Sequence, residues 1–493
     1  MDSLGLILYL FITITLLQAL QSILRLTKTR SKLPPGPTLL PVIGNLLKLG
    51  DKPHKSMAEL AKTHGPIMSL KLGQITAVVI SSPALAKEVL QKQDLAFSYR
   101  TIPNALHAHD QHKYSVIWLP VSDRWRSLRK IMTSNMFSGS RLDANQNLRR
   151  QKVKELIAHV GKCCQDGIAV EIGSAAFATS LNLISNTLFS VDLTDLNQDS
   201  SREYRDFVWN IMVEAGKPNL VDYFPVLSKI DPQGIRGRMK VHLGKLLKLF
   251  GGLIDERLEL RKLQKTNGEN DVIDILLNLN QEIDRTHIER MCLDLFLAGT
   301  DTTSSTVEWA MAELLHNLEY LKKAKAELEQ IIGKGKQIQE SDISQLPYLQ
   351  AIVKETMRIH PAIPFLLHKV ETDVEVYSYT VPKGAQVLVN VWAIARDPGI
   401  WRNPTTFMPE RFLESKIDVR GQDFELIPFG AGRRICPGLP LALRMVIVVL
   451  GSLINSFEWK LEGGIEPEEL NMEDKIGFTL QKAQPLRAIP FLM

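Results

Sequence analysis

The residue whose setting most suggests chemistry is Cys436, within the segment 429–438, which reads FGAGRRICPG. Glycines at positions 430, 432 and 438 permit backbone conformations and close approaches that other residues resist. Such a loop can present a sulfur atom to a flat ligand, and a thiolate bound to haem iron favours O–O cleavage. Arg434 can help to keep the sulfur ionised. A cysteine taken alone is usually a small buried hydrophobe, so the whole pattern carries the interpretation.

The pattern FxxGxRxCxG resembles the haem-binding loop of the cytochrome P450 family, and every fixed position is matched, including Gly438. The resemblance implies that haem b is the cofactor and that Cys436 is its axial iron ligand. It also implies that Arg434 pairs with a haem propionate and that Phe429 packs near the sulfur. The apolar stretch 439–453 that follows is predicted to be a long buried helix.

A second motif, AGTDTT at 298–303, lies inside the longest predicted helix, 288–318. Threonines in mid-helix are locally unfavourable, and a hydroxyl that bonds to the carbonyl one turn back can bend the helix beside Gly299. Surface threonines are the alternative interpretation. By resemblance this is the family's oxygen-activating turn: Asp301 and Thr302 would be its catalytic acid and alcohol, and Ala298, Gly299 and Thr302 would contact the haem.

Two further segments agree with the resemblance. Glu355 and Arg358 share a helix face at i and i+3, and an isolated pair of this kind is usually a weak surface contact. The family buries the pair and joins it to the arginine of a PERF-like segment, here Arg411, as a structural triad. Trp125 and Arg129, four residues apart, can offer an indole N–H and a guanidinium to one propionate, although a basic surface helix is the alternative.

The chain departs from the family after position 361, where it reads AIPFLLHK. Relatives typically carry a proline before the basic pair, and here Leu367 runs straight into His368. In the family this strand lines the pocket and its basic residue, here His368, touches a propionate. Since a one-residue slip in a strand exchanges its faces, we predict altered substrate preference or weakened haem retention.

Most other elements are predicted to be helical. Helical apolar spacing recurs at 84–92, 146–162, 239–264, 288–318 and 349–359, a hairpin turning at Gly73-Gln74 is expected at 67–79, and another strand at 387–391. The segment 399–413 is expected to be packed irregular structure. The predicted fold is mainly α with a small β portion: the cytochrome P450 fold, as a single large domain plus an N-terminal transmembrane helix.

The first segment predicts a membrane anchor. No charged residue occurs at 3–24, which is long enough to span a bilayer, and Arg25, Lys28, Arg30 and Lys32 follow. The positive-inside rule then leaves the body in the cytosol. A cleaved signal peptide is less consistent, because its charge would precede the apolar run. We expect an anchor at 1–25, a basic and proline-rich hinge at 26–37 and the catalytic domain at 38–493.

Composition narrows the class of protein further. The net charge is +5 without a broad basic stripe, which argues against a nucleic-acid partner. The resemblance implies a single-pass protein of the endoplasmic reticulum membrane with a cytosolic catalytic domain. NADPH–cytochrome P450 reductase would be its partner and source of electrons.

Stretches such as IPNALHAHD and VWNIMVEAGKPNLVDYFP resemble the geraniol 8-hydroxylase subfamily of plants. This implies O₂-dependent hydroxylation of a small apolar metabolite, such as a monoterpenoid alcohol. The alternatives are a haem-thiolate isomerase or dehydratase acting on a peroxide, and a catalytically impaired haem-binding relative. The candidates for substrate contact are Asn104, Thr300, Ile363, Phe365, Phe478 and Leu480.

Overall fold

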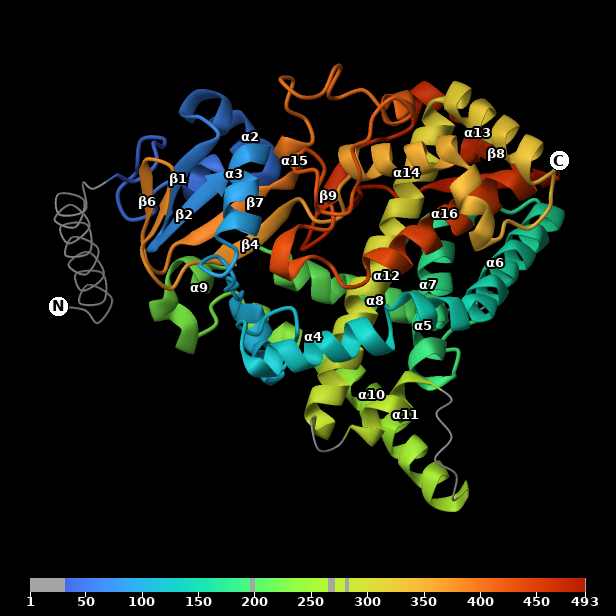
Figure 1. Cartoon of the computed structure of the whole chain (residues 1–493), viewed down its shortest axis with the longest axis horizontal. Coiled ribbons are helices and arrows are strands. Elements are labelled where there is room, and N and C mark those ends of the chain that lie inside the picture. Colours follow the sequence, from blue (N-terminus) through green and yellow to red (C-terminus); the bar gives the residue numbers. More distant parts are fainter. Residues whose placement is uncertain (1–31, 196–199, 265–270, 280–282, 493) are drawn as a thin grey trace, which may run out of the picture. The chain divides into compact units, whose positions relative to one another are not determined.

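A computed structural model describes residues 32–195, 200–264, 271–279 and 283–492. The predicted anchor, and the predicted hinge up to residue 31, lie outside the described residues. The described chain is mainly helical with small sheets, as expected (Figure 1). It forms two compact units. Within the described residues the first comprises 32–101, 218–233 and 365–394, and the second comprises 102–217, 234–364 and 395–492.

The first unit is built around a four-stranded sheet in the order β1-β2-β7-β4, with a two-stranded ribbon of β5 and β6. Its strands are β1 (Ile67–Leu72), β2 (Ile75–Ile80), β4 (Phe365–Lys369), β5 (Val374–Val376), β6 (Tyr379–Val381) and β7 (Gln386–Asn390). Its helices are η1 (Leu46–Lys48), α2 (Pro53–His64), α3 (Pro83–Lys87), η2 (Glu88–Lys92), α9 (Leu220–Tyr223), η4 (Pro225–Lys229) and α15 (Val391–Ile394).

Turn chemistry and register explain this sheet. The predicted hairpin is confirmed, since β1 and β2 pair antiparallel and Gly73 adopts the positive φ of 58° that its turn needs. β7 joins β2 in parallel, and β4 joins β7 antiparallel with Phe365 opposite Asn390. The five residues of β4 pair one for one with those of β7, so the strand at the sequence departure is regular.

The second unit contains the long helices. These are α4 (Asp123–Asn135), α5 (Gly139–Ala144), α6 (Gln146–Asp166), α7 (Ile172–Phe189), α8 (Ser200–Gly216), α10 (Ile235–Gln264), α11 (Val272–Asn278), α12 (Arg285–His316), α13 (Leu318–Ile331), α14 (Pro347–Ile359) and α16 (Leu439–Ser456). The 3₁₀ segments are η3 (Asn104–Lys113), η5 (Glu340–Gln345), η6 (Pro409–Phe412), η7 (Gly432–Arg434), η8 (Glu462–Gly464) and η9 (Pro467–Glu469). Its strands are β3 (Val170–Glu171), β8 (Phe457–Leu461), β9 (Asp474–Ile476), β10 (Leu480–Lys482) and β11 (Arg487–Leu492).

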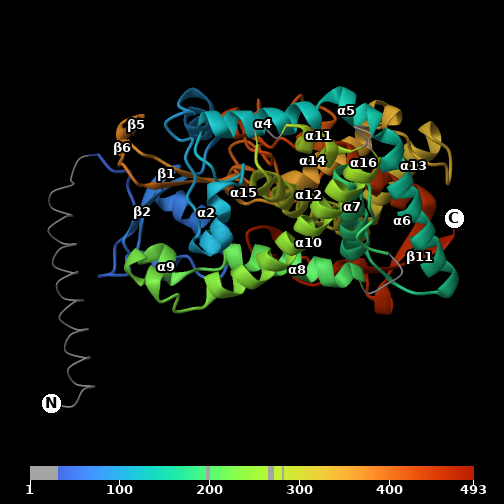
Figure 2. The same ribbon diagram turned by 90° about the horizontal axis from the view of Figure 1, so that it is seen from below.

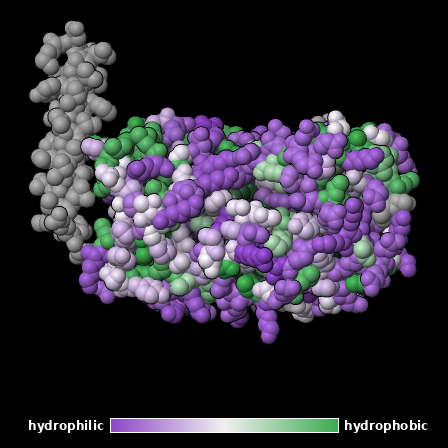
Figure 3. Space-filling model, turned by 90° about the horizontal axis from the view of Figure 1, so that it is seen from above, coloured by the Kyte–Doolittle hydropathy of each residue, from purple (hydrophilic) through white to green (hydrophobic). Residues whose placement is uncertain are grey.

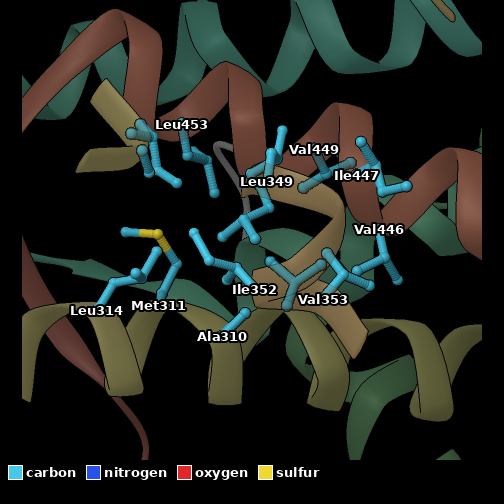
Figure 4. Close-up of a cluster of buried hydrophobic side chains, with 14 of the residues drawn as sticks. Ala310, Met311, Leu314, Leu349, Ile352, Val353, Val446, Ile447, Val449 and Leu453 are labelled. Atoms are coloured by element: carbon cyan, nitrogen blue, oxygen red, sulfur yellow. The ribbon is translucent and has the colours of Figure 1, made fainter. Parts of the chain in front are cut away.

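Helix α12 is the central element of the second unit. Its N-terminus is capped by Asp284, whose side chain accepts from the N–H of His287. It packs along α7, and its C-terminal half shares a core with α14 and α16 (Figures 1, 2 and 4). In that core Met311 and Leu314 of α12 lie opposite Ile352 of α14 and Leu453 of α16 (Figure 4).

The predicted helices are confirmed with small changes at their ends. The segment 84–92 is not one α-helix, because α3 continues into a π-helical turn, η2. The helix expected to reach residue 318 ends at 316, where Asn317 leaves helical geometry with ψ of 78°. Among the described residues, α16 is the one helix long and apolar enough to cross a membrane, but two thirds of it, 67%, is buried in the protein. We therefore interpret α16 as a core helix.

Candidate functional site

The loop around Cys436 is folded so that its sulfur faces backbone donors. Gly430 and Gly432 have positive φ angles of 71° and 65°, which turn the chain back so that the Cys436 N–H donates to the Phe429 carbonyl at 3.0 Å. Gly438 then begins α16, and a Cβ placed on it would lie 3.8 Å from the Cys436 sulfur.

The pKa of the Cys436 thiol lies above its ordinary value in the protein without a metal. Burial raises the pKa of its thiol, whereas the N–H groups of Gly438 and Leu439 and the positive charge of Arg129 act to lower it. A cation bound at the sulfur, such as a metal, would favour the thiolate form further. The sulfur is therefore placed as a ligand that can become anionic once a metal is present.

The guanidinium groups of Arg434 and Arg129 lie over the indole ring of Trp125, beside this loop. Arg434 lies 5.2 Å and Arg129 lies 6.0 Å from the centre of the Trp125 ring. Arg129, on α4, donates to the carbonyl of Ile435. Arg434 donates to the carbonyls of Ile117 (3.3 Å) and Leu119.

The charge of Arg129 is not matched by a carboxylate. Within the part of the chain that the structure describes, no Asp or Glu forms an ion pair with it. Its pKa is lowered by burial and raised by Cys436. A half-buried cation of this kind fits an anionic group supplied from outside the chain.

Helix α12 is buried through its middle except for a short accessible stretch at residues 297–299 and 302, which we name the window. Between Arg290 and Leu315 every residue is buried except positions 297–299 and 302, with Ala298 classed as exposed. Ala298 and Thr302 are one turn apart, so they share this face. The predicted local bond is present, since the Thr302 hydroxyl donates to the Ala298 carbonyl at 2.6 Å. The space beside Gly299 is filled by Ile184 of α7, because a Cβ at Gly299 would lie 2.5 Å from the Ile184 Cδ1.

Asp301 points away from this window and is held by the strand β10 region. Its carboxylate accepts from the Thr479 hydroxyl at 2.6 Å and from the side-chain amide of Gln481. Burial raises the pKa of Asp301, and these two donors act to lower it. The Ser305 hydroxyl, one turn later, donates to the Leu480 carbonyl at 2.9 Å.

No sequence motif predicted that Thr479 and Gln481 would donate to Asp301. The signal that could have found them is the apolar–polar alternation of Phe478-Thr479-Leu480-Gln481. Such alternation places Thr479 and Gln481 on the same face of a strand.

Glu355, Arg358 and Arg411 lie together in the core of the second unit. Arg358 donates through Nε and Nη2 to the two Glu355 oxygens at 2.7 and 2.8 Å, and Arg411 Nε donates to Glu355 Oε1 at 3.0 Å. The Glu355 and Arg358 side chains are both 0% exposed. Both arginines lie over the Trp401 ring.

The candidate substrate residues are distributed over both units. In the second unit Asn104 and Leu480 are buried, Ile363 is half-buried, and Phe478 is half-buried with its ring edge-on to Trp118 at 5.7 Å. Thr300 is fully buried, and its hydroxyl donates to the Phe296 carbonyl at 2.8 Å. Phe365 belongs to the first unit, on β4.

His368 also belongs to the first unit, where it is buried on β4. Its Nδ1 lies 2.6 Å from the Phe97 carbonyl, and its Nε2 lies 3.5 Å from the Arg100 guanidinium. Since a carbonyl can only accept, Nδ1 carries the proton, and Nε2 faces a cation. The ring is therefore fixed in orientation by residues of its own unit.

The second unit therefore presents the kinds of group that can bind a porphyrin. It has a sulfur ligand, a half-buried cation for a propionate, and an exposed window of small and hydroxylated residues on the central helix. Haem fits these residues, and when bound it supplies the oxygen chemistry that side chains cannot perform. The arrangement defines the class of haem-thiolate proteins.

Comparison with known proteins agrees with this class. The family model described as "Cytochrome P450" matches residues 34–486, and the chain belongs to the cytochrome P450 family. Geraniol 8-hydroxylase of Swertia mussotii is 66% identical over 482 residues, covering 97% of this chain and 96% of that protein. Geraniol 8-hydroxylase of Catharanthus roseus is 65% identical over 496 residues, covering 99% of both chains.

A solved zebra fish cytochrome P450 with progesterone superimposes with a TM-score of 0.76 at 26% identity, covering 89% of this chain and 99% of that one. The protein is a haem-dependent monooxygenase. It uses electrons from NADPH, delivered by a reductase, and acts on a small substrate. The isomerase and impaired-relative alternatives are not favoured by these relatives.

Proposed function

We propose that this chain hydroxylates geraniol, or a closely related monoterpenoid alcohol, at carbon 8. The observation that carries the proposal is its similarity, over nearly its whole length, to two proteins named geraniol 8-hydroxylase. The half-buried Phe478 and the Leu297 and Ala298 side chains of the window on α12 support it, since a small apolar substrate suits such a lining. Thr300 already bonds its own helix, so Asn104 is the better candidate to bind the substrate hydroxyl.

We propose the residues that hold the haem from the family resemblance, and the geometry at Cys436 and Arg129 supports part of the set. Cys436 would ligate iron, and Arg129 and Arg434 would hold the propionates. Trp125, whose single N–H donates to the Val116 carbonyl at 3.1 Å, would join them as a haem contact that holds both guanidinium groups over its ring. The remaining proposed contacts are Ala298, Gly299, Thr302, His368, Phe429 and Gly438. Glu355, Arg358 and Arg411 would support the loop without touching the reaction.

Asp301 and Thr302 are proposed to supply protons to the oxygen site. The Thr302 hydroxyl lies at the exposed window and can pass a proton at its Oγ1 atom, because that atom both donates and accepts. Asp301 is the adjacent acid, and two donors fix the direction of its carboxylate. Thr479 and Gln481 therefore act as positioning residues for Asp301 in this proposal.

Membrane attachment is proposed from the sequence pattern at residues 1–32. An anchor at 1–25, a hinge at 26–37 and a catalytic domain at 38–493 would place the enzyme on the cytosolic face of the endoplasmic reticulum, in terpenoid biosynthesis. The described surface in Figure 3 is mainly hydrophilic. Large apolar side chains are nevertheless exposed soon after the proposed hinge, at Leu39 (38%), Leu40 (45%) and Leu47 (73%). Resistance to carbonate extraction from microsomes, lost on deletion of residues 2–25, tests the anchor.

Expression with a plant reductase in microsomes tests the proposed reaction. Geraniol, NADPH and O₂ should give a product 16 mass units heavier with the hydroxyl at carbon 8, and the Cys436→Ala variant should give none. A normal carbon monoxide spectrum without any oxygenated geraniol would refute the substrate. A panel of other monoterpenoid alcohols would then identify the replacement.

A further inference from the structure

Asp294, a buried carboxylate on α12 two turns before Asp301, has no part in the mechanism above. It is 4% exposed and stands alone as a charge in the apolar run 291–298, MCLDLFLA. Burying a carboxylate is costly unless several donors satisfy it. The hydrogen-bond donors around Asp294 therefore indicate which part of the protein this carboxylate stabilises.

The hydrogen-bond donors to this carboxylate come from one segment, 111–116. The Ser115 hydroxyl and the Gln111 amide donate to Oδ1 at 2.8 and 3.1 Å, and the Val116 N–H donates to Oδ2 at 2.8 Å. The Ile117 N–H donates in turn to the Ser115 hydroxyl at 3.2 Å. One carboxylate thus fixes the path of the backbone through residues 115–117.

The opposite side of the same backbone holds the cation cluster. The Val116 carbonyl accepts from the Trp125 indole at 3.1 Å, and the Ile117 and Leu119 carbonyls accept from Arg434. We name residues 115–119 the clamp loop. The Ser115 hydroxyl and the Val116 N–H of this loop lie on Asp294, and its Val116, Ile117 and Leu119 carbonyls lie on Trp125 and Arg434.

We propose that Asp294 is a positioning residue for haem, which orders the clamp loop and through it Trp125 and Arg434. The inference rests on the proposed haem contacts of these two residues. In this proposal Asp294 connects α12, the helix proposed to activate oxygen, to the residues on the propionate side of the cofactor. Loss of Asp294 should loosen the haem without altering any group that touches it.

Titration of Asp294 offers a readout that packing alone would not give. Burial raises the pKa of Asp294 to about 7, although its hydrogen bonds act to lower it. The facing groups from η3 and the clamp loop are Gln111, Ser115 and backbone N–H groups, which do not titrate. The charged neighbour is Arg290, one turn earlier on α12. The ionised carboxylate accepts all its donors, and protonation removes one acceptor site. Haem should therefore be held more firmly above pH 7 than below it.

The experiment measures haem dissociation from the full-length holoprotein by transfer to excess apomyoglobin. We expect Asp294→Asn to resemble the protonated state, with dissociation about tenfold faster than for the fully ionised protein, equivalent to about 1.4 kcal/mol. With a pKa near 7, the variant should be about fivefold faster than the natural protein at pH 8. At pH 6 the two should differ by less than about twofold.

Three further variants make the result decisive. Asp274→Asn removes a different buried carboxylate, paired with Arg257 at 2.7 Å, and should leave haem dissociation unchanged. Ser115→Ala keeps the charge and should accelerate dissociation about two- to threefold. Arg434→Ala should accelerate it strongly. In the apoprotein, the Val116 amide should exchange hydrogen faster in Asp294→Asn than in Asp274→Asn.

The outcomes separate the inference from the proposed function. Equal dissociation from Asp294→Asn and the natural protein at pH 8 overturns the inference, as does the same acceleration in Asp274→Asn. A ratio that does not change between pH 8 and pH 6 also overturns it. If Arg434→Ala leaves haem retention unchanged, the proposed clamp itself is wrong. If Asp294→Asn fails to fold, Ser115→Ala decides alone, and an unchanged rate there overturns the proposal.

Discussion

Replacing Glu355 by alanine removes the anion that two arginines share. Glu355 accepts four hydrogen bonds: two from Arg358, one from Arg411 and one from the Met408 N–H at 2.8 Å. Arg358 is 0% exposed, so the variant leaves a fully buried cation without its counter-charge. Breaking a buried pair from one side typically costs about 3–5 kcal/mol. We expect a loss of that size, and a lower yield of haem-loaded protein, because the Met408 N–H and the Arg411 guanidinium lose their bonds to α14.

Urea denaturation followed by tryptophan fluorescence measures this loss. Glu355→Gln keeps an acceptor and the side-chain volume, so its loss should be smaller. The matched control is Lys323→Ala, which breaks the exposed Lys323–Glu410 ion pair in the same region and should cost less than about 1 kcal/mol. The reasoning is refuted if Glu355→Ala and Lys323→Ala destabilise the protein by the same small amount.

Three other predictions concern the reaction itself. Thr302→Ala should still consume NADPH but release hydrogen peroxide in place of product, and normal coupling in that variant would remove Thr302 from the proton supply. Thr479→Val should lower the ratio of product formed to NADPH consumed, and it should raise the pKa of Asp301 further by removing a donor. The control is Ser305→Ala, which loses only a bond to the Leu480 carbonyl. Equal coupling in both variants would argue against a role for Thr479. Insertion of a proline between Leu367 and His368 should raise haem content or change substrate preference. No change in either would refute the prediction that the missing proline alters substrate preference or weakens haem retention.

Local patterns predicted much of the fold. The long helices follow from apolar spacing, and the hairpin at 67–79 follows from its Gly73 turn. What could not be read locally is pairing between distant segments, such as β7 against both β2 and β4. The π-helical turn at 88–92 is a further example, because its spacing on the apolar face is close to that of an α-helix.

In the candidate site, too, local motifs could be predicted from the sequence, whereas contacts between distant segments could not. Cys436 stands within a motif that the sequence displays whole. Asp294 and Ser115 are 179 positions apart, and neither segment alone indicates that they meet. The polar residue in the apolar run 291–298 signalled a buried carboxylate, but its partner is fixed only by how α12 packs against the clamp loop. The structure is therefore needed to see that these groups form one system.

The central claim is that the Cys436 sulfur, as a thiolate, is the axial ligand of haem iron. The reduced, carbon monoxide-bound holoprotein tests it most directly, because its Soret maximum reports the ligand opposite carbon monoxide. The account predicts the thiolate-type maximum for the natural protein and the nitrogen-type maximum, at shorter wavelength, for Cys436→His. A natural protein that binds haem but shows only the nitrogen-type spectrum, or a Cys436→His variant with an unchanged one, would contradict the account.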